Sequence, residues 1–126
     1  MKKIIQSSSA PAPIGPYSQA VLAGNILFVS GQIPLDPATG QLVTNDIEKA
    51  TSLVMQHLEN ILREAGMDFS HVVKTSIFLA DMNDFPRVNE IYGKFFEGMD
   101  PPARETVQVA RLPKDVQVEI SMIAVK

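Results

Sequence analysis

The sequence contains no cysteine, which excludes thiol catalysis, disulfide bonds and metal sites built on cysteine. It has only two histidines, His57 and His71, and neither belongs to a set of acidic or histidine residues at the spacing of metal ligands. We therefore expect both histidines to be structural or solvated, and we expect no metal and no cofactor. Basic residues are also in deficit, because 11 Lys and Arg stand against 14 Asp and Glu, a net charge of -3. This balance argues against a nucleic acid as the main ligand.

Long hydrophobic runs are absent as well. No stretch is apolar enough to span a membrane, and the short apolar run near the first residue is too brief for a signal peptide. A cytoplasmic protein is the expectation. With 126 residues, 45% of them hydrophobic and 20% charged, the chain predicts one soluble globular domain over residues 1–126.

The patterns along the chain predict the element order β-β-β-α-β-α-β-β. Strands are expected at 3–6, 17–22, 26–30, 72–79, 103–112 and 116–125, and a second helix at 84–97. The first helix should begin after Asn45 as N-cap, with Glu48 at capping-box spacing, and end at Gly66. This order favours a two-layer α+β domain, in which both helices cover one face of a mixed sheet.

The other face of that sheet remains apolar in places. Alternation in the last strand puts Ile123 and Val125 beside Glu119 on this face, and the strand at 26–30 is apolar on both sides. Apolar surface of this kind indicates a partner, and most soluble oligomers are symmetric assemblies of one chain. We infer a homo-oligomer packed sheet to sheet.

Prolines delimit the strand that follows the second helix, with a Pro-Pro pair before it and Pro113 after it. Alternation places Arg104, Thr106, Gln108 and Ala110 on one face of this strand. An arginine just after a rigid corner suits bidentate capture of a carboxylate or phosphate. The alternative is a surface ion pair, worth roughly 0–1 kcal/mol.

No catalytic triad, phosphate loop or metal cluster appears, so a binding site must be assembled from isolated polar residues. The candidates are Tyr17, Ser30, Gly31, Asn89, Arg104, Thr106 and Glu119. Together they suit a small carboxylate-bearing molecule, with the carboxylate on Arg104 and the Gly31 N–H, and with Glu119 orienting or deprotonating a water. Structural roles remain open: Glu119 pairing with an arginine, Tyr17 anchoring the proline-rich loop, and Asn89 as helix surface.

Several motifs resemble one known family. They are Ile14-Gly15-Pro16-Tyr17-Ser18-Gln19-Ala20, Ser30-Gly31-Gln32-Ile33-Pro34, Val88-Asn89-Glu90-Ile91-Tyr92, Pro102-Ala103-Arg104, Val109-Ala110-Arg111-Leu112-Pro113 and Val118-Glu119-Ile120. In this order, over nearly the whole chain, they are similar to the Rid (YjgF) family, the reactive intermediate deaminases, in its RidA branch. The resemblance implies a chorismate-mutase-like homotrimer with a central barrel and three sites in the clefts between subunits.

The activity implied by the resemblance is 2-iminobutanoate/2-iminopropanoate deaminase: hydrolysis of reactive 2-imino acids, formed from enamines such as 2-aminoacrylate, to 2-oxo acids and ammonia. Carried over by motif, Arg104 and Gly31 would bind the carboxylate and Glu119 would position the attacking water. Tyr17, Ser30, Asn89 and the Thr106 backbone would line the pocket. The chain departs from the branch at Glu105-Thr106, where relatives often have Ser-Cys or Thr-Thr, so any thiol-linked regulation is absent.

Two other functions remain as alternatives. A trimer that binds small 2-oxo acids without turning them over would need the same Arg104 pocket. A ribonuclease or translation inhibitor, as is reported for some relatives, fits the acidic charge poorly.

By alternation Glu105 should point away from Arg104, so that it does not compete with a ligand for the guanidinium.

Overall fold

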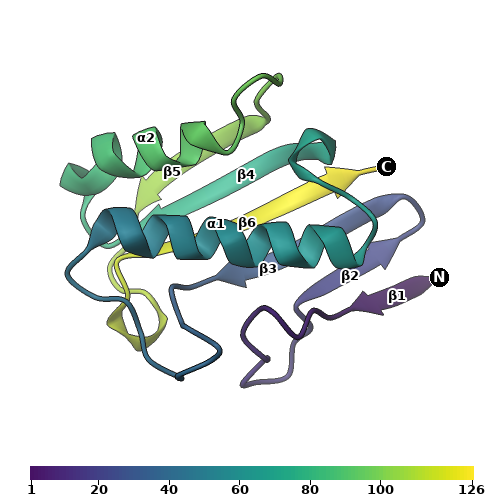
Figure 1. Ribbon diagram of the computed structural model, residues 1–126, viewed down its shortest axis with the longest axis horizontal. Helices are drawn as coiled ribbons and strands as arrows, with labels where there is room; N and C mark the ends of the chain where they lie inside the picture. Colours follow the sequence, from purple (N-terminus) through teal and green to yellow (C-terminus); the bar gives the residue numbers. More distant parts are fainter.

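Two helices lie on one face of a six-stranded sheet, and the other face is uncovered (Figure 1). The computed structural model describes all residues 1–126. The element order is β1–β2–β3–α1–β4–α2–β5–β6, which confirms the predicted order and the two-layer α+β class. The helices cover the sheet side by side, and both chain ends lie at the same end of it (Figure 1). No helix is long and apolar enough to cross a membrane.

The strands are β1 (Lys2–Ile5), β2 (Ala20–Ala23), β3 (Ile26–Gln32), β4 (Val72–Leu79), β5 (Ala103–Gln108) and β6 (Val118–Val125). Their order across the sheet is β1-β2-β3-β6-β4-β5. All neighbours are antiparallel except β4 and β5, which are parallel. The last strand therefore lies in the middle of the sheet, and β5 forms one edge.

Three of these strands are shorter than the sequence predicts, and the last of them begins at Val118 rather than at Val116. The second begins at Ala20 rather than Tyr17, because the preceding segment is a proline-rich loop with few backbone donors. The fifth ends at Gln108 instead of reaching the proline at 113. Its pairing with β4 stops where β4 itself ends, at Leu79, so Ala110 lies beyond the strand.

The helices are α1 (Ile47–Glu64) and α2 (Phe85–Lys94). The predicted N-cap of α1 is wrong by one residue: Asp46 accepts the Lys49 N–H at 3.1 Å, while Asn45 takes a left-handed turn with φ 60°. The C-terminal prediction is confirmed, since Gly66 has φ 73°. Pro86 lies in the first turn of α2, where its missing N–H costs no helical bond.

The core lies between the helices and the sheet. All the residues predicted for the inner face of α1 are buried, and so is the alternate set in β6. These sets are Ile47, Ala50, Thr51, Val54, Leu58, Ile61, Leu62 and Ala65, with Val118, Ile120, Met122 and Ala124. His57 is also buried, and its Nε2 bonds the Leu35 carbonyl at 2.7 Å.

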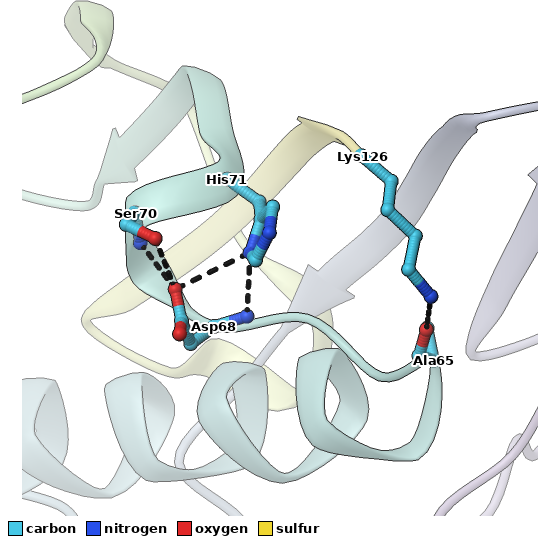
Figure 2. Close-up of polar contacts among 5 residues, drawn as sticks. All are labelled: Ala65, Asp68, Ser70, His71 and Lys126. Carbon is cyan, nitrogen blue, oxygen red and sulfur yellow. Dashed lines mark hydrogen bonds and ion pairs between the residues drawn. The ribbon is translucent and has the colours of Figure 1, made fainter.

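The connection from α1 to β4 is fixed by local polar contacts (Figure 2). Asp68 accepts a bond from the Ser70 N–H at 2.9 Å, and its own N–H donates to Nδ1 of His71 at 3.0 Å. The Lys126 ammonium donates to the Ala65 carbonyl at 3.3 Å, which ties the end of β6 to the end of α1. His71 therefore ends a 3-10 turn just before β4, rather than opening the strand.

The uncovered face of the sheet carries exposed apolar side chains. Phe28 of β3 and Val107 of β5 are 47% and 41% exposed, while the flanking Leu27 and Val29 are buried against the helices. Ile123 and Val125 pair with Phe28 and Ile26 across the same face. The apolar outer face predicted from the sequence is thus present, and nothing in a single chain covers it.

Candidate functional site

Arg104 lies on edge strand β5, with its side chain on the helix-covered side of the sheet. Its neighbour in the β4 register is Thr75, which is fully buried under α2, and partners in parallel strands share a face. The guanidinium donates to the side-chain oxygen Oδ1 of Asn89, in α2, at 2.8 Å. It also lies over the rings of Phe85 and Tyr92, 5.5 and 5.1 Å from their centroids.

These contacts hold the arginine in one place and leave part of its donor set free. The Asn89 bond uses only one N–H of the five that a guanidinium carries, and Arg104 forms no ion pair. A hollow of about 450 Å³ opens beside it, walled also by Tyr92 and Phe96. An unpaired, ring-supported guanidinium at the rim of a hollow is suited to a carboxylate.

Alternation in β5 places the residues after Arg104 as predicted. Glu105 points to the other face, where it pairs with Lys74 at 2.7 Å and accepts a bond from Ser76. It therefore does not compete for Arg104. Thr106 returns to the helix side beside buried Ile77, and its Oγ1 is buried with no hydrogen-bond partner in the chain.

Glu119 and Gly31 form a second cluster on neighbouring strands β6 and β3. A Cβ placed on Gly31 would lie 2.4 Å from Oε2 of Glu119 and 2.7 Å from its Cδ, so only glycine leaves room for this carboxylate. Glu119 forms no ion pair, and burial raises its pKa above the ordinary value. The alternative that Glu119 pairs with an arginine of its own chain is therefore wrong.

A proline-rich loop and an irregularity in β3 complete this second cluster. The register of β3 with β6 shifts between Val29 and Gln32, and a bulge of this kind re-aims side chains at strand ends. Here Ser30 donates from Oγ to the Ser18 carbonyl at 2.6 Å. Tyr17, from the adjacent loop, is 51% exposed. With Gly31 and Glu119 they line a cavity of about 380 Å³.

The sequence did not single out two residues that the structure adds. Lys114 lines the Glu119 cavity and has a left-handed backbone, with φ 56°; a non-glycine residue in that region is uncommon and is found at functional sites. Tyr92 is buried in the core, but its ring also supports Arg104, and its hydroxyl bonds Thr75 at 3.0 Å. A left-handed lysine gives no sequence signal, because the preference belongs to glycine and asparagine.

The two clusters lie on opposite faces of the sheet. Glu119 pairs in register with Phe78, whose neighbours Ile77 and Leu79 are fully buried under the helices, so Glu119 points to the uncovered face. Arg104 points to the covered face. One chain thus holds Arg104, Asn89 and Thr106 in one place, and Tyr17, Ser30, Gly31 and Glu119 in another.

Comparison with known proteins shows which family the chain belongs to. A family model described as Endoribonuclease L-PSP matches residues 7–126. A rat protein named 2-iminobutanoate/2-iminopropanoate deaminase is 50% identical over 126 residues, which cover 100% of this chain and 91% of the rat protein.

Solved structures agree in fold. A member of the Rid family from Yersinia pestis matches with a TM-score of 0.98 at 47% identity, over 100% of both chains. The TdcF protein of E. coli, solved with bound serine, matches with a TM-score of 0.95 at 43% identity, over 98% of both chains. The architecture is therefore that of the YjgF/L-PSP fold. The chain belongs to that family, the Rid family that its motifs resemble.

Proposed function

We propose that this protein hydrolyses 2-imino acids to 2-oxo acids and ammonia, at a site shared by two copies of the chain. The observation that carries the proposal is a pair of incomplete half-sites. One holds the guanidinium of Arg104, which has free N–H donors and no ion pair. The other holds the half-buried carboxylate of Glu119, packed against Gly31. The full-length likeness to a relative named as such a deaminase supports the substrate class. The serine found in TdcF supports an amino-acid-sized ligand.

The carboxylate end of the substrate is held first. Arg104 offers a fork of N–H donors that matches a carboxylate, and the rings of Phe85 and Tyr92 keep its guanidinium from swinging away. The bond to Asn89 fixes one edge of the guanidinium and leaves its other N–H groups for the substrate. Because the anchor is pre-formed, binding costs little side-chain ordering.

The chemical step is addition of water to the imine carbon. The ionised Glu119 accepts a proton from water as the new C–O bond forms and passes that proton to the imine nitrogen, which gives a neutral carbinolamine and restores the carboxylate. Collapse of that intermediate breaks the C–N bond, releases ammonia and leaves the 2-oxo acid. Imines are electrophilic enough that positioning a water and matching charge suffice, without a protein nucleophile.

The opposed faces explain why two copies are needed. Arg104 and Glu119 of one chain cannot reach the same small molecule through the sheet that separates them. Packing of the uncovered apolar faces of several copies would bury Phe28 and Val107. It would also bring β5 of one subunit toward the Glu119 cavity of the next, as the family's trimer implies.

The direct test is release of 2-oxo acid and ammonia from 2-iminopropanoate, generated in the assay by an amino-acid oxidase acting on alanine. We expect the wild type to accelerate hydrolysis above the uncatalysed rate and Arg104→Ala to abolish the gain, because the carboxylate loses its partner. Binding of 2-oxobutanoate without any acceleration would instead establish a metabolite-binding protein. RNA cleavage that survives in Arg104→Ala would favour the ribonuclease.

Sharing of the site is tested by co-expressing Arg104→Ala with Glu119→Ala. Neither variant alone has a complete site, but a mixed trimer has one in which both residues are wild type. Random mixing in equal amounts should restore about a quarter of wild-type activity, because about three quarters of trimers are mixed and each regains one site of three. No recovery in verified mixed trimers would show that each site lies within one chain.

A further inference from the structure

We propose that Gln19 is a positioning residue, whose buried side chain closes the loop from Pro11 to Gln19 and thereby sets Tyr17 over the Glu119 cavity. This inference rests on the proposed function for its catalytic consequence, although its structural part can be tested without it. No substrate contact is assigned to Gln19 itself.

The loop that carries Tyr17 has almost no backbone framework of its own. It contains Pro11, Pro13 and Pro16, which have no N–H to donate. Between residues 8 and 18 the backbone–backbone bonds are those from Ala10 to the Ser7 carbonyl at 3.4 Å and from Tyr17 to the Gly15 carbonyl at 2.8 Å. A segment this poor in backbone bonds must be fixed by side chains.

Gln19 supplies those bonds. Its Oε1 accepts the Ser7 N–H at 2.7 Å, and its Nε2 donates to the carbonyls of Pro11 at 2.8 Å and Ser7 at 3.1 Å. The side chain is only 2% exposed, so water cannot replace these partners cheaply. Both donor and acceptor are used, which is a pattern that glutamine meets and that glutamate or methionine does not.

The same residue joins the loop to the rest of the site through its backbone. The Gln19 carbonyl accepts the Ser30 N–H at 2.9 Å, next to Gly31. The side chain of Gln19 thus holds the Pro11 end of the loop, and its backbone ties the other end of the loop, just before β2, to β3. Tyr17 lies between these two ends. Tyr17 and Gln19 also line one small cavity of about 30 Å³.

Apart from Gln19, the nearest side-chain bond that fixes Tyr17 is at its neighbour, where Ser30 donates from Oγ to the Ser18 carbonyl at 2.6 Å. The Tyr17 side chain is 51% exposed and forms no hydrogen bond in the chain. Because the prolines fix φ at three positions, the loop is stiff, and the positions of its two ends determine where Tyr17 lies. Loss of the Gln19 clamp should therefore move Tyr17 and leave the core intact. A displacement of about 1 Å at a binding group can cost on the order of a hundredfold in rate.

The experiment uses the two tyrosines of the chain, Tyr17 and Tyr92, as separate reporters in protein labelled with 3-fluorotyrosine. Tyr92 is 4% exposed in the core, so its ¹⁹F resonance reports the global fold. In Gln19→Met and Gln19→Glu we expect the Tyr17 resonance to move toward that of free fluorotyrosine while the Tyr92 resonance stays. The exposed glutamine Gln56, changed to methionine, is the matched control and should move neither.

Two functional readouts complete the test. Gln19→Met should weaken 2-oxobutanoate binding and slow imine hydrolysis by about tenfold or more, and it should add little to Tyr17→Ala, since both act through the same ring. An unmoved Tyr17 resonance, or joint movement of both resonances, would overturn the proposal, as would fully additive effects. If the wild type neither binds 2-oxobutanoate nor hydrolyses imine, the proposed function fails, while the two resonances still decide the role of Gln19.

Discussion

Substitution of Gly31 by alanine should remove activity while leaving the fold nearly as stable as before. The backbone of Gly31 is not in the left-handed region reserved for glycine, so alanine is conformationally acceptable there. The obstacle is Glu119, because three atoms of its side chain would lie 2.4, 2.7 and 2.9 Å from the new methyl carbon. Atoms at these separations overlap, so the carboxylate must leave its position.

The change in the free energy of unfolding of Gly31→Ala follows from two opposing terms. Replacing glycine lowers the entropy of the unfolded chain, which stabilises the protein by about 0.4–1 kcal/mol, whereas overpacking typically costs about 1–3 kcal/mol. Glu119 is only half-buried and can swing outward, so the cost of the clash lies at the low end of the overpacking range. We therefore expect the free energy of unfolding to change by about 1 kcal/mol or less, and imine hydrolysis to fall by about a hundredfold or more, as for loss of a general base.

Chemical denaturation and the 2-iminopropanoate assay measure these two quantities on the same preparations. Gly31→Ala made in a Glu119→Ala background is the control, because the clashing carboxylate is then absent and the alanine should cost little further activity. Full activity in Gly31→Ala would refute the reasoning, since the carboxylate would then not be needed where the structure puts it. A large further loss in the Glu119→Ala background would equally show that Gly31 acts through something else.

Four further outcomes are expected. Arg104→Lys should lose most of the affinity for a 2-oxo acid in a titration, because an ammonium cannot reproduce the bidentate fork or the stacking on two rings. Burial raises the pKa of Glu119 above its ordinary 4.5, so the activity of the wild type should fall as pH drops through that raised pKa. Because the pKa is raised in the folded state, the stability that Glu119 contributes is fully present below pH 4.5 and is lost as the pH rises through the folded pKa. Glu119→Gln should therefore melt at a higher temperature than the wild type at neutral pH, but not at acidic pH. Tyr92→Phe should cost about 1 kcal/mol in denaturation, because it leaves the buried Thr75 hydroxyl without its 3.0 Å partner.

Helix α1 and the central strands could be read from the sequence because their burial is one-sided and periodic. The eight apolar positions assigned to α1 are all buried, and the alternate residues of β6 divide between the two faces as predicted. The cap was harder, since Asn45 and Asp46 are both good N-cap residues. What decided between them is the left-handed turn at Asn45, which a capping-box spacing does not reveal.

The sequence could nominate residues for the candidate site, but it could not predict how they are arranged in space. The family motifs pointed to Arg104 and Glu119 one by one, and alternation correctly predicted which residues of each strand share a face. Whether two residues on different strands share a face depends on the register of every strand between them, here β4. Sequence periodicity says nothing about that register when neither face of an edge strand is clearly apolar.

The edge strand β5 shows why the ordinary rule fails here. Its alternation sets Val107 against Arg104 and Thr106, and the usual expectation would bury the valine under the helices and expose the arginine. The structure has the reverse: Val107 is 41% exposed on the uncovered face, and Arg104 lies over two rings of α2. Together with Phe28 of β3, which is 47% exposed on the same face, Val107 belongs to an apolar surface of the kind that marks an interaction site. The second subunit that we propose, packed against the uncovered face, would account for both the burial pattern of β5 and the separation of Arg104 from Glu119.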